Sequence, residues 1–152
     1  MTTAPTNIHP SPAALSLRGL EGREVPTRVV DLGSGRPFVF LHGLVGLNDH
    51  WEQSAHALAP HARAVMLEFP LLDLQGEDCS IHGVTELTVR FLERHVREPA
   101  VLVGNSFGGH VALRVAVERP QPVAGPALPR PPGVSPRTTP PRGRLPPPPP
   151  GR

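Results

Sequence analysis

The chain has 152 residues, which suits one domain, and its charges divide unevenly along it. Residues 1–119 hold ten Arg and all 13 acidic residues, whereas residues 120–152 hold five Arg and no acid. The basic character therefore belongs to the C-terminal part, where no aromatic residues are interleaved with the basic ones, so we expect no nucleic-acid partner.

The cysteine content and the hydropathy predict a cytoplasmic location. Cys79 is the only cysteine, so no disulfide can form within the chain. The segment Met1–Pro12 has neither the basic start nor the apolar run of a signal peptide. No stretch approaches the roughly 20 consecutive apolar residues that cross a bilayer, so we expect no membrane partner.

The N-terminal part predicts a disordered start followed by two strands. Prolines interrupt residues 1–14, which we expect to be disordered. Residues 15–20 predict a short edge strand. Apolar and polar residues alternate over Val25–Leu32, which indicates a strand with one covered face.

Two continuous apolar runs predict strands that are buried on both faces, as in a parallel sheet. The first is Phe38–Leu41 and the second is Ala64–Leu67. Between them, Asp49 and Glu52 have the spacing of a capping box, which predicts the start of a short helix.

A longer helix and a third buried strand follow. Residues 83–97 place apolar residues on one face at helical spacing. We expect Glu86 to pair with Arg90, and Glu93 with Arg97, on the opposite face. Residues 100–103 then form another apolar run.

This run leads into a Gly-x-Ser-x-Gly pattern made by Gly104, Ser106 and Gly108. Such a pattern between a strand and a helix is typical of a nucleophile elbow, a sharp turn that raises a serine hydroxyl above the sheet. Residues 107–118 continue as a helix that is apolar nearly all round, which predicts that it is buried.

The alternation of strands and helices predicts an α/β fold with a doubly wound parallel sheet. Ligands bind beyond the carboxyl ends of such strands. The pair His42 and Gly43 follows one strand end and Ser106 follows another, so we expect them to converge in space.

These residues resemble the α/β-hydrolase fold family over roughly residues 20–119. Phe38–Gly43 resembles the strand that ends in the family's His-Gly oxyanion motif. Glu68–Pro70 sits where the family has its next strand-end turn, and Gly104–Gly109 resembles the elbow, with His110–Leu113 continuing as its helix does.

The resemblance implies that Ser106 is a nucleophile that attacks a carbonyl carbon of a small-molecule acyl substrate. The backbone N–H groups of Phe107 and Leu44 would form the oxyanion hole. The implied reactions are hydrolysis of an ester, a thioester, an amide or a C–C bond. A dehalogenase of this fold would need Asp where Ser106 stands. Neither a cofactor nor a metal is expected.

The chain departs from the family's triad, which runs Ser, then Asp or Glu, then His. After Ser106 the sequence offers only His110 and Glu118, and both lie on the helix that leads away from the elbow. We therefore expect Ser106 to lack its general base and the chain to be inactive as written.

Upstream residues offer no replacement. We interpret the isolated histidines as surface or packing residues; they are His50, His56 and His61. We interpret the acids of the loop after the second buried strand as solvated; they are Asp73, Glu77 and Asp78.

The composition changes abruptly after the elbow helix. Residues 120–152 contain 14 of the 22 prolines, which predicts a disordered tail after a partial hydrolase domain at 15–119. We attribute this change to a shifted reading frame in G+C-rich DNA. The alternative is a non-catalytic remnant whose segment Arg144–Pro150 matches Arg-x-x-Pro-x-x-Pro, a ligand pattern for SH3 or WW domains.

Overall fold

The structure, a computed structural model, describes residues 13–130, with side chains described up to residue 125. Its strands are β1 (Ala13–Arg18), β2 (Glu24–Leu32), β3 (Pro37–Leu41), β4 (Arg63–Glu68), β5 (Ala100–Asn105) and β6 (Val123–Arg130). Its helices are α1 (Asp49–Leu58), α2 (Ile81–Phe91) and α3 (Phe107–Glu118), with a 3₁₀ turn at Gly76–Asp78 and a π-helical turn at Leu92–Val96. The predicted α/β architecture is confirmed.

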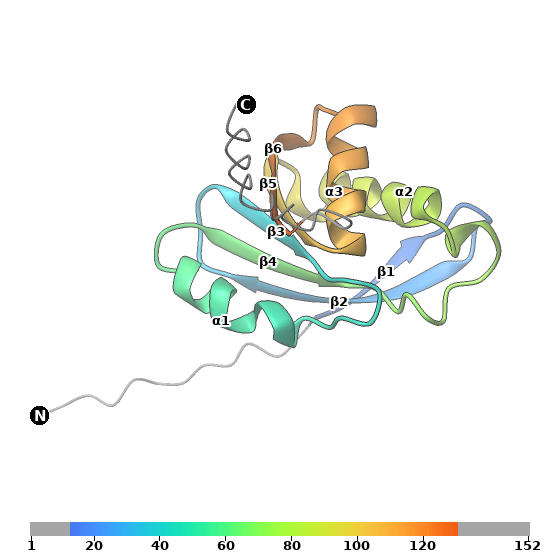
Figure 1. Cartoon of the computed structure of the whole chain (residues 1–152), viewed down its shortest axis with the longest axis horizontal. Coiled ribbons are helices and arrows are strands. Elements are labelled where there is room, and N and C mark those ends of the chain that lie inside the picture. The colour runs from blue at the N-terminus through green and yellow to red at the C-terminus, as the bar shows by residue number, and fades with distance from the viewer. Residues whose placement is uncertain (1–12, 131–152) are drawn as a thin grey trace, which may run out of the picture.

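The strands form one mixed sheet in the order β1-β2-β4-β3-β5-β6 (Figure 1). The four strands β4, β3, β5 and β6 are parallel, as predicted, but β1 and β2 are antiparallel to each other and β2 is antiparallel to β4. The predicted parallel sheet thus carries an antiparallel edge that the sequence analysis did not predict. A tight turn, closed by a 2.7 Å bond from Gly19 N–H to Arg23 O, joins β1 to β2, and so short a connection permits only a hairpin.

Helices cover both faces of the sheet and create two cores. Figure 1 shows α1 on one side, with α2 and α3 on the other. In β4, Val65 and Leu67 belong to the larger core under α2 and α3, while Ala64 and Met66 belong to the smaller core with α1. The continuous apolar run of β4 is explained by this double burial.

The α1 N-terminus differs from the predicted capping box. Its N-cap is Asn48, whose side chain makes no capping hydrogen bond. Instead the backbone N–H of Asn48 donates to Glu68 Oε2 at 2.9 Å. The carboxylate that satisfies this donor thus comes from the end of β4, 20 residues away in the sequence, and not from within the helix.

The predicted helix over residues 83–97 is confirmed with a shifted start. Ser80 Oγ accepts from Gly83 N–H at 2.9 Å and so caps α2 at Ile81. The expected i,i+4 ion pairs are replaced by contacts with other elements: Arg90 donates to Gly19 O, and Glu86 pairs with Arg119 at 3.1 Å. Arg97 donates to the backbone of Arg94.

The chain continues in the sheet beyond α3, where the sequence predicted that the fold would stop. Strand β6 pairs in parallel with β5, from Ala100 opposite Val123 to Asn105 opposite Arg130. The α3 helix is buried on one face only, since Leu113 is 46% and Val117 73% exposed. The expected tail beyond residue 130, with its Arg144–Pro150 motif, lies outside the described residues.

A charged cluster joins elements at the opposite end of the strands from Ser106. Arg63, the first residue of β4, pairs with Asp31 of β2 at 2.7 Å and with Glu98 before β5 at 3.4 Å. Its hydrogen bond with Asp31 raises the pKa of the Arg63 guanidinium. His95 Nε2 lies 3.4 Å from the same Asp31 carboxylate.

Candidate active site

Ser106 occupies a strained turn between β5 and α3. Its backbone has φ 52° and ψ −116°, and apart from Arg97 it is the sole non-glycine residue with positive φ within residues 13–130. The residue is exposed, whereas the ends of β5 and α3 beside it are largely buried. A backbone held in such a sparsely populated region is typical of a nucleophile elbow, where the strain keeps the side chain out in front of the sheet.

The two flanking glycines let α3 approach the sheet very closely. A Cβ atom on Gly104 would lie 2.3 Å from Gly108 O, and one on Gly108 would lie 2.2 Å from Leu41 O. All of these neighbours are backbone atoms, which no rotamer change can move. Glycine is therefore required at both positions by the contact between β3, β5 and α3.

The His-Gly pair after β3 converges on the elbow, as predicted. A Cβ atom on Gly43 would lie 3.5 Å from Ser106 Cβ and 3.6 Å from Asn105 O. After Gly43 the chain makes a tight turn, closed by a 2.9 Å bond from Gly46 N–H to Gly43 O. Leu44 is the first central residue of that turn, so its N–H is not used in closing it.

The other predicted oxyanion donor is the N–H of Phe107, the first residue of α3. The first N–H groups of a helix have no partner within the helix, and they carry the positive end of its dipole. The arrangement thus offers a free donor directly beside Ser106.

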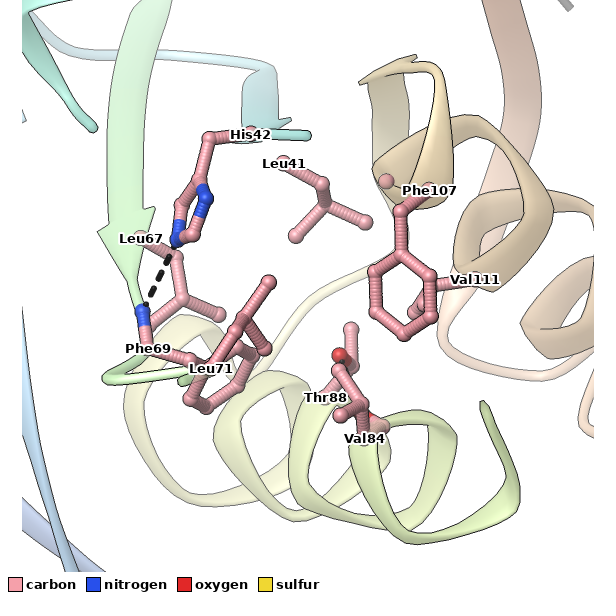
Figure 2. A pocket seen from close by; sticks show the side chains of 10 residues that line it. Leu41, His42, Leu67, Phe69, Leu71, Val84, Thr88, Phe107 and Val111 are labelled. Carbon is pink, nitrogen blue, oxygen red and sulfur yellow. Dashed lines mark hydrogen bonds between the residues drawn. The ribbon is translucent and has the colours of Figure 1, made fainter. Parts of the chain in front are cut away.

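His42 uses both ring nitrogens to connect two loops. The ring is buried, with 4% of the residue exposed. Its Nδ1 lies 2.7 Å from Gly43 O, and its Nε2 accepts the backbone N–H of Phe69 at 3.1 Å (Figure 2). Because Nε2 accepts, the proton of the neutral ring is on Nδ1 and is donated to Gly43 O. His42 therefore positions the strand-end loops and has no free nitrogen with which to deprotonate Ser106.

A small apolar cavity lies between the sheet and helices α2 and α3 (Figure 2). Its volume of about 10 Å³ accommodates roughly one water molecule. Its lining includes Phe69, Val84, Phe107 and Val111. This space is too small for a substrate group.

The isolated histidines are exposed, and none of them hydrogen-bonds to Ser106. Within residues 13–130 the structure places no hydrogen-bond partner on Ser106 Oγ. His56 and His61 are exposed, as expected, and His56 lies 3.9 Å from Glu52. His110 is on the first turn of α3, and Glu118 at its far end pairs with Arg114 at 2.6 Å.

His50 lies nearer to the site than its sequence context indicated. Its ring Nδ1 would be 3.2 Å from a Cβ atom on Gly46, in the turn that follows Gly43. The residue is exposed. It is the one candidate among the upstream histidines whose contribution to Ser106 chemistry needs a direct test.

The expectation that the loop acids are solvated was wrong for Asp78. That residue is 2% exposed, and its Oδ1 accepts the backbone N–H of Leu20 at 2.7 Å. The contact joins the β1–β2 hairpin to the segment before α2, so Asp78 is structural. Asp73, Glu77 and the free Cys79 are exposed.

The described part of the chain gives no evidence of a metal site or a membrane span. No group of three His, Cys, Asp or Glu side chains in it could hold a metal ion. None of its helices is long and apolar enough to cross a bilayer.

The sequence is similar to those of known hydrolases and of one acetyltransferase component. The model of the "Alpha/beta hydrolase family" matches residues 38–152. The sn-1-specific diacylglycerol lipase of Xenopus tropicalis is 33% identical over 110 residues, which cover 62% of this chain and 34% of the relative. The acetyltransferase component of the acetoin cleaving system of Cupriavidus necator is 31% identical over 99 residues, covering 63% and 26%.

Solved structures show the same fold. A thermophilic esterase from Thermogutta terrifontis superimposes with a TM-score of 0.66 at 19% identity, covering 76% of this chain and 44% of the esterase. The chain therefore spans between a quarter and about a third of the length of these curated relatives and less than half of this esterase.

Proposed function

Because the chain belongs to the alpha/beta hydrolase family, we propose that Ser106 is the nucleophile of a serine hydrolase site. The observation that carries the proposal is the strained backbone of Ser106 at the junction of β5 and α3, with Gly43 packed against it. A serine that is held exposed at a helix N-terminus, next to unpaired N–H groups, is arranged for attack on a carbonyl carbon.

The chemistry follows from these positions. Ser106 Oγ adds to the carbonyl carbon of an ester, thioester or amide, and the oxyanion that forms accepts hydrogen bonds from the N–H groups of Phe107 and Leu44. In comparable sites each such donor lowers the barrier by about 3–4 kcal/mol. Given a general base that takes the hydroxyl proton and passes it to the leaving group, collapse of the tetrahedral intermediate expels that group and leaves an acyl-Ser106, which water then hydrolyses.

Within residues 13–130 no hydrogen bond joins the Ser106 hydroxyl to a base that could receive its proton. Both nitrogens of His42 are engaged, and beyond Glu118 the sequence contains neither an acid nor a histidine. A serine without a base is a weak nucleophile, and in subtilisin loss of the histidine costs about 10⁶ in turnover. We therefore propose that these 152 residues by themselves do not turn over esters above the buffer rate.

The relatives do not indicate one substrate, because one is named a lipase and another an acetyltransferase component. The alternative function, a non-catalytic remnant with a proline-rich arm, rests on Arg144–Pro150. Titrating a peptide of residues 140–152 against SH3 and WW domains tests it, and no binding below millimolar concentration would end it. Reading the coding DNA from codon 115 in three frames separates a shifted frame from a genuine arm.

A direct test of the proposed nucleophile uses an alkyl fluorophosphonate at alkaline pH. Ser Oγ displaces fluoride from phosphorus, and the hydroxyl proton passes to solvent. We expect mass spectrometry to find the adduct on Ser106 at least tenfold faster than on other serines, because the adjacent N–H donors stabilise the developing charge.

The control variants are Ser106→Ala, which should abolish the fast adduct, and Ser54→Ala on the exposed face of α1, which should leave it unchanged. Equal labelling of all serines would refute the nucleophile assignment. Steady hydrolysis of p-nitrophenyl esters that depends on Ser106 would refute the proposed inactivity.

A further inference from the structure

Exposed apolar side chains gather on the two loops that follow β3 and β4. Within the described part of the chain six large apolar side chains are exposed, and four of them lie on these loops. They are Leu44 (49% exposed), Val45 (81%), Leu47 (52%) and Leu72 (73%), which we call the apolar rim. The other two, Leu113 and Val117, lie on α3.

The two loops of the apolar rim are fixed side by side. The hydrogen bond from Phe69 N–H to His42 Nε2 joins them at their bases (Figure 2). Each loop then turns back: Gly46 bonds to Gly43 O at 2.9 Å, and Asp73 N–H bonds to Pro70 O at 2.9 Å. The rim is thus carried on two ordered turns, and the first of them begins at Gly43, where a Cβ atom would lie 3.5 Å from Ser106 Cβ.

The surface of the rim carries no charge of its own. Residues 43–47 and 69–72 contain no acidic or basic side chain. The carboxylate of Glu68, which precedes the second loop, is occupied by the N–H of Asn48. Asp73 and His50 lie exposed at the border of the rim, and the loop residues between them are apolar. Such a surface gains free energy by covering hydrocarbon.

We propose that the apolar rim binds the hydrocarbon chain of an acyl substrate, with the carbonyl carbon of that ester or thioester presented to Ser106. This inference rests on the proposed role of Ser106 and adds the class of acyl group that the site accepts. It places substrate recognition on the strand-end loops of this chain, on the side from which Ser106 is accessible.

The experiment compares the rates at which ethyl and octyl fluorophosphonates label Ser106 in the full 152-residue chain. Each fully buried methylene strengthens association about fourfold, so burial equivalent to two of the six additional carbons gives a preference of at least about tenfold. We expect Leu44→Ser combined with Leu72→Ser to remove most of this preference. The matched pair Leu113→Ser with Val117→Ser should retain it.

A second measurement does not depend on covalent labelling. Methyl NMR of the chain is recorded with 1-monodecanoylglycerol below its critical micelle concentration. We expect saturable shifts of the methyl signals of the four rim residues and none at Leu113 or Val117.

The outcomes separate the two proposals. Labelling of Ser106 at equal rates by both reagents, without rim shifts, would overturn the rim alone. Rim shifts without labelling of Ser106 would overturn the nucleophile and leave the hydrocarbon site standing. Shifts of equal size at Leu113 and Val117 would show general adsorption and overturn the rim.

Discussion

The substitution Gly108→Ala tests whether α3 lies against the sheet as closely as the structure indicates. A Cβ atom at this position would lie 2.2 Å from Leu41 O and 2.6 Å from His42 O, where ordinary contact begins near 3.4 Å. To accept one methyl group, α3 must move away from β3 by about 1 Å, which opens the packing of the larger core.

The expected cost can be worked from these contacts. Overpacking of a close-packed interior costs about 1–3 kcal/mol, and obstruction by backbone atoms places this case at the upper end. Replacing glycine within a helix returns about 1 kcal/mol. We therefore expect the free energy of unfolding to fall by about 2 kcal/mol, which corresponds to a Tm about 8 °C lower for a domain of this size.

The assay is thermal unfolding followed by circular dichroism. The matched control is Gly125→Ala in β6, where a Cβ atom has no described side chain or backbone within 4 Å, and its Tm should stay within about 2 °C of the parent. If Gly108→Ala melted at the parent's temperature while remaining folded, the inferred contact between α3 and the end of β3 would be wrong.

Other substitutions address the buried polar contacts and the missing base. His42→Ala leaves the buried N–H of Phe69 unpaired, so we expect a loss of about 2 kcal/mol in denaturant unfolding together with slower labelling of Ser106; His42→Gln, which keeps an acceptor, should recover part of both. Unchanged stability of His42→Ala would count against the link between the loops. Asp78→Ala should cost about 1–3 kcal/mol through the lost bond to Leu20, whereas Glu77→Ala, at an exposed neighbour, should change stability by less than about 0.5 kcal/mol. If both cost the same, Asp78 does not hold the hairpin. Labelling of Ser106 should rise steadily with hydroxide concentration and be unchanged in His50→Ala; a break in the pH profile that His50→Ala removes would identify His50 as the base.

Local sequence patterns were sufficient for most of the secondary structure. The runs Phe38–Leu41 and Ala64–Leu67 predicted strands covered on both faces, and the two cores on either side of β4 confirm them. The Gly-x-Ser-x-Gly spacing predicted a strand-to-helix turn at Ser106, and its positive φ is the strain that such a turn imposes. These features depend on residues that are neighbours along the chain, so the sequence alone predicts them.

Several of the failures involve residues far apart in the sequence. The cap of α1 depends on Glu68, and the burial of Asp78 depends on Leu20, 58 positions away. Strand β6 has no apolar periodicity after Gly125, and its place is set by pairing along the edge of β5. Buried backbone donors and acceptors form hydrogen bonds with residues that become neighbours only in the folded chain, and a local sequence pattern does not identify those residues.

The same division holds for the site. The sequence by itself determined the nucleophile candidate, its flanking glycines and the absence of an acid or a histidine after Glu118, because these depend only on residue type and on the order of residues along the chain. Only the tertiary structure decided that His42 is committed through both nitrogens, that His50 lies beside the Gly43–Gly46 turn, and that four exposed apolar residues share the edge of Ser106. Parallel strands end at one edge of a sheet, so loops from distant parts of the chain meet there, and their contacts exist only once the sheet has formed.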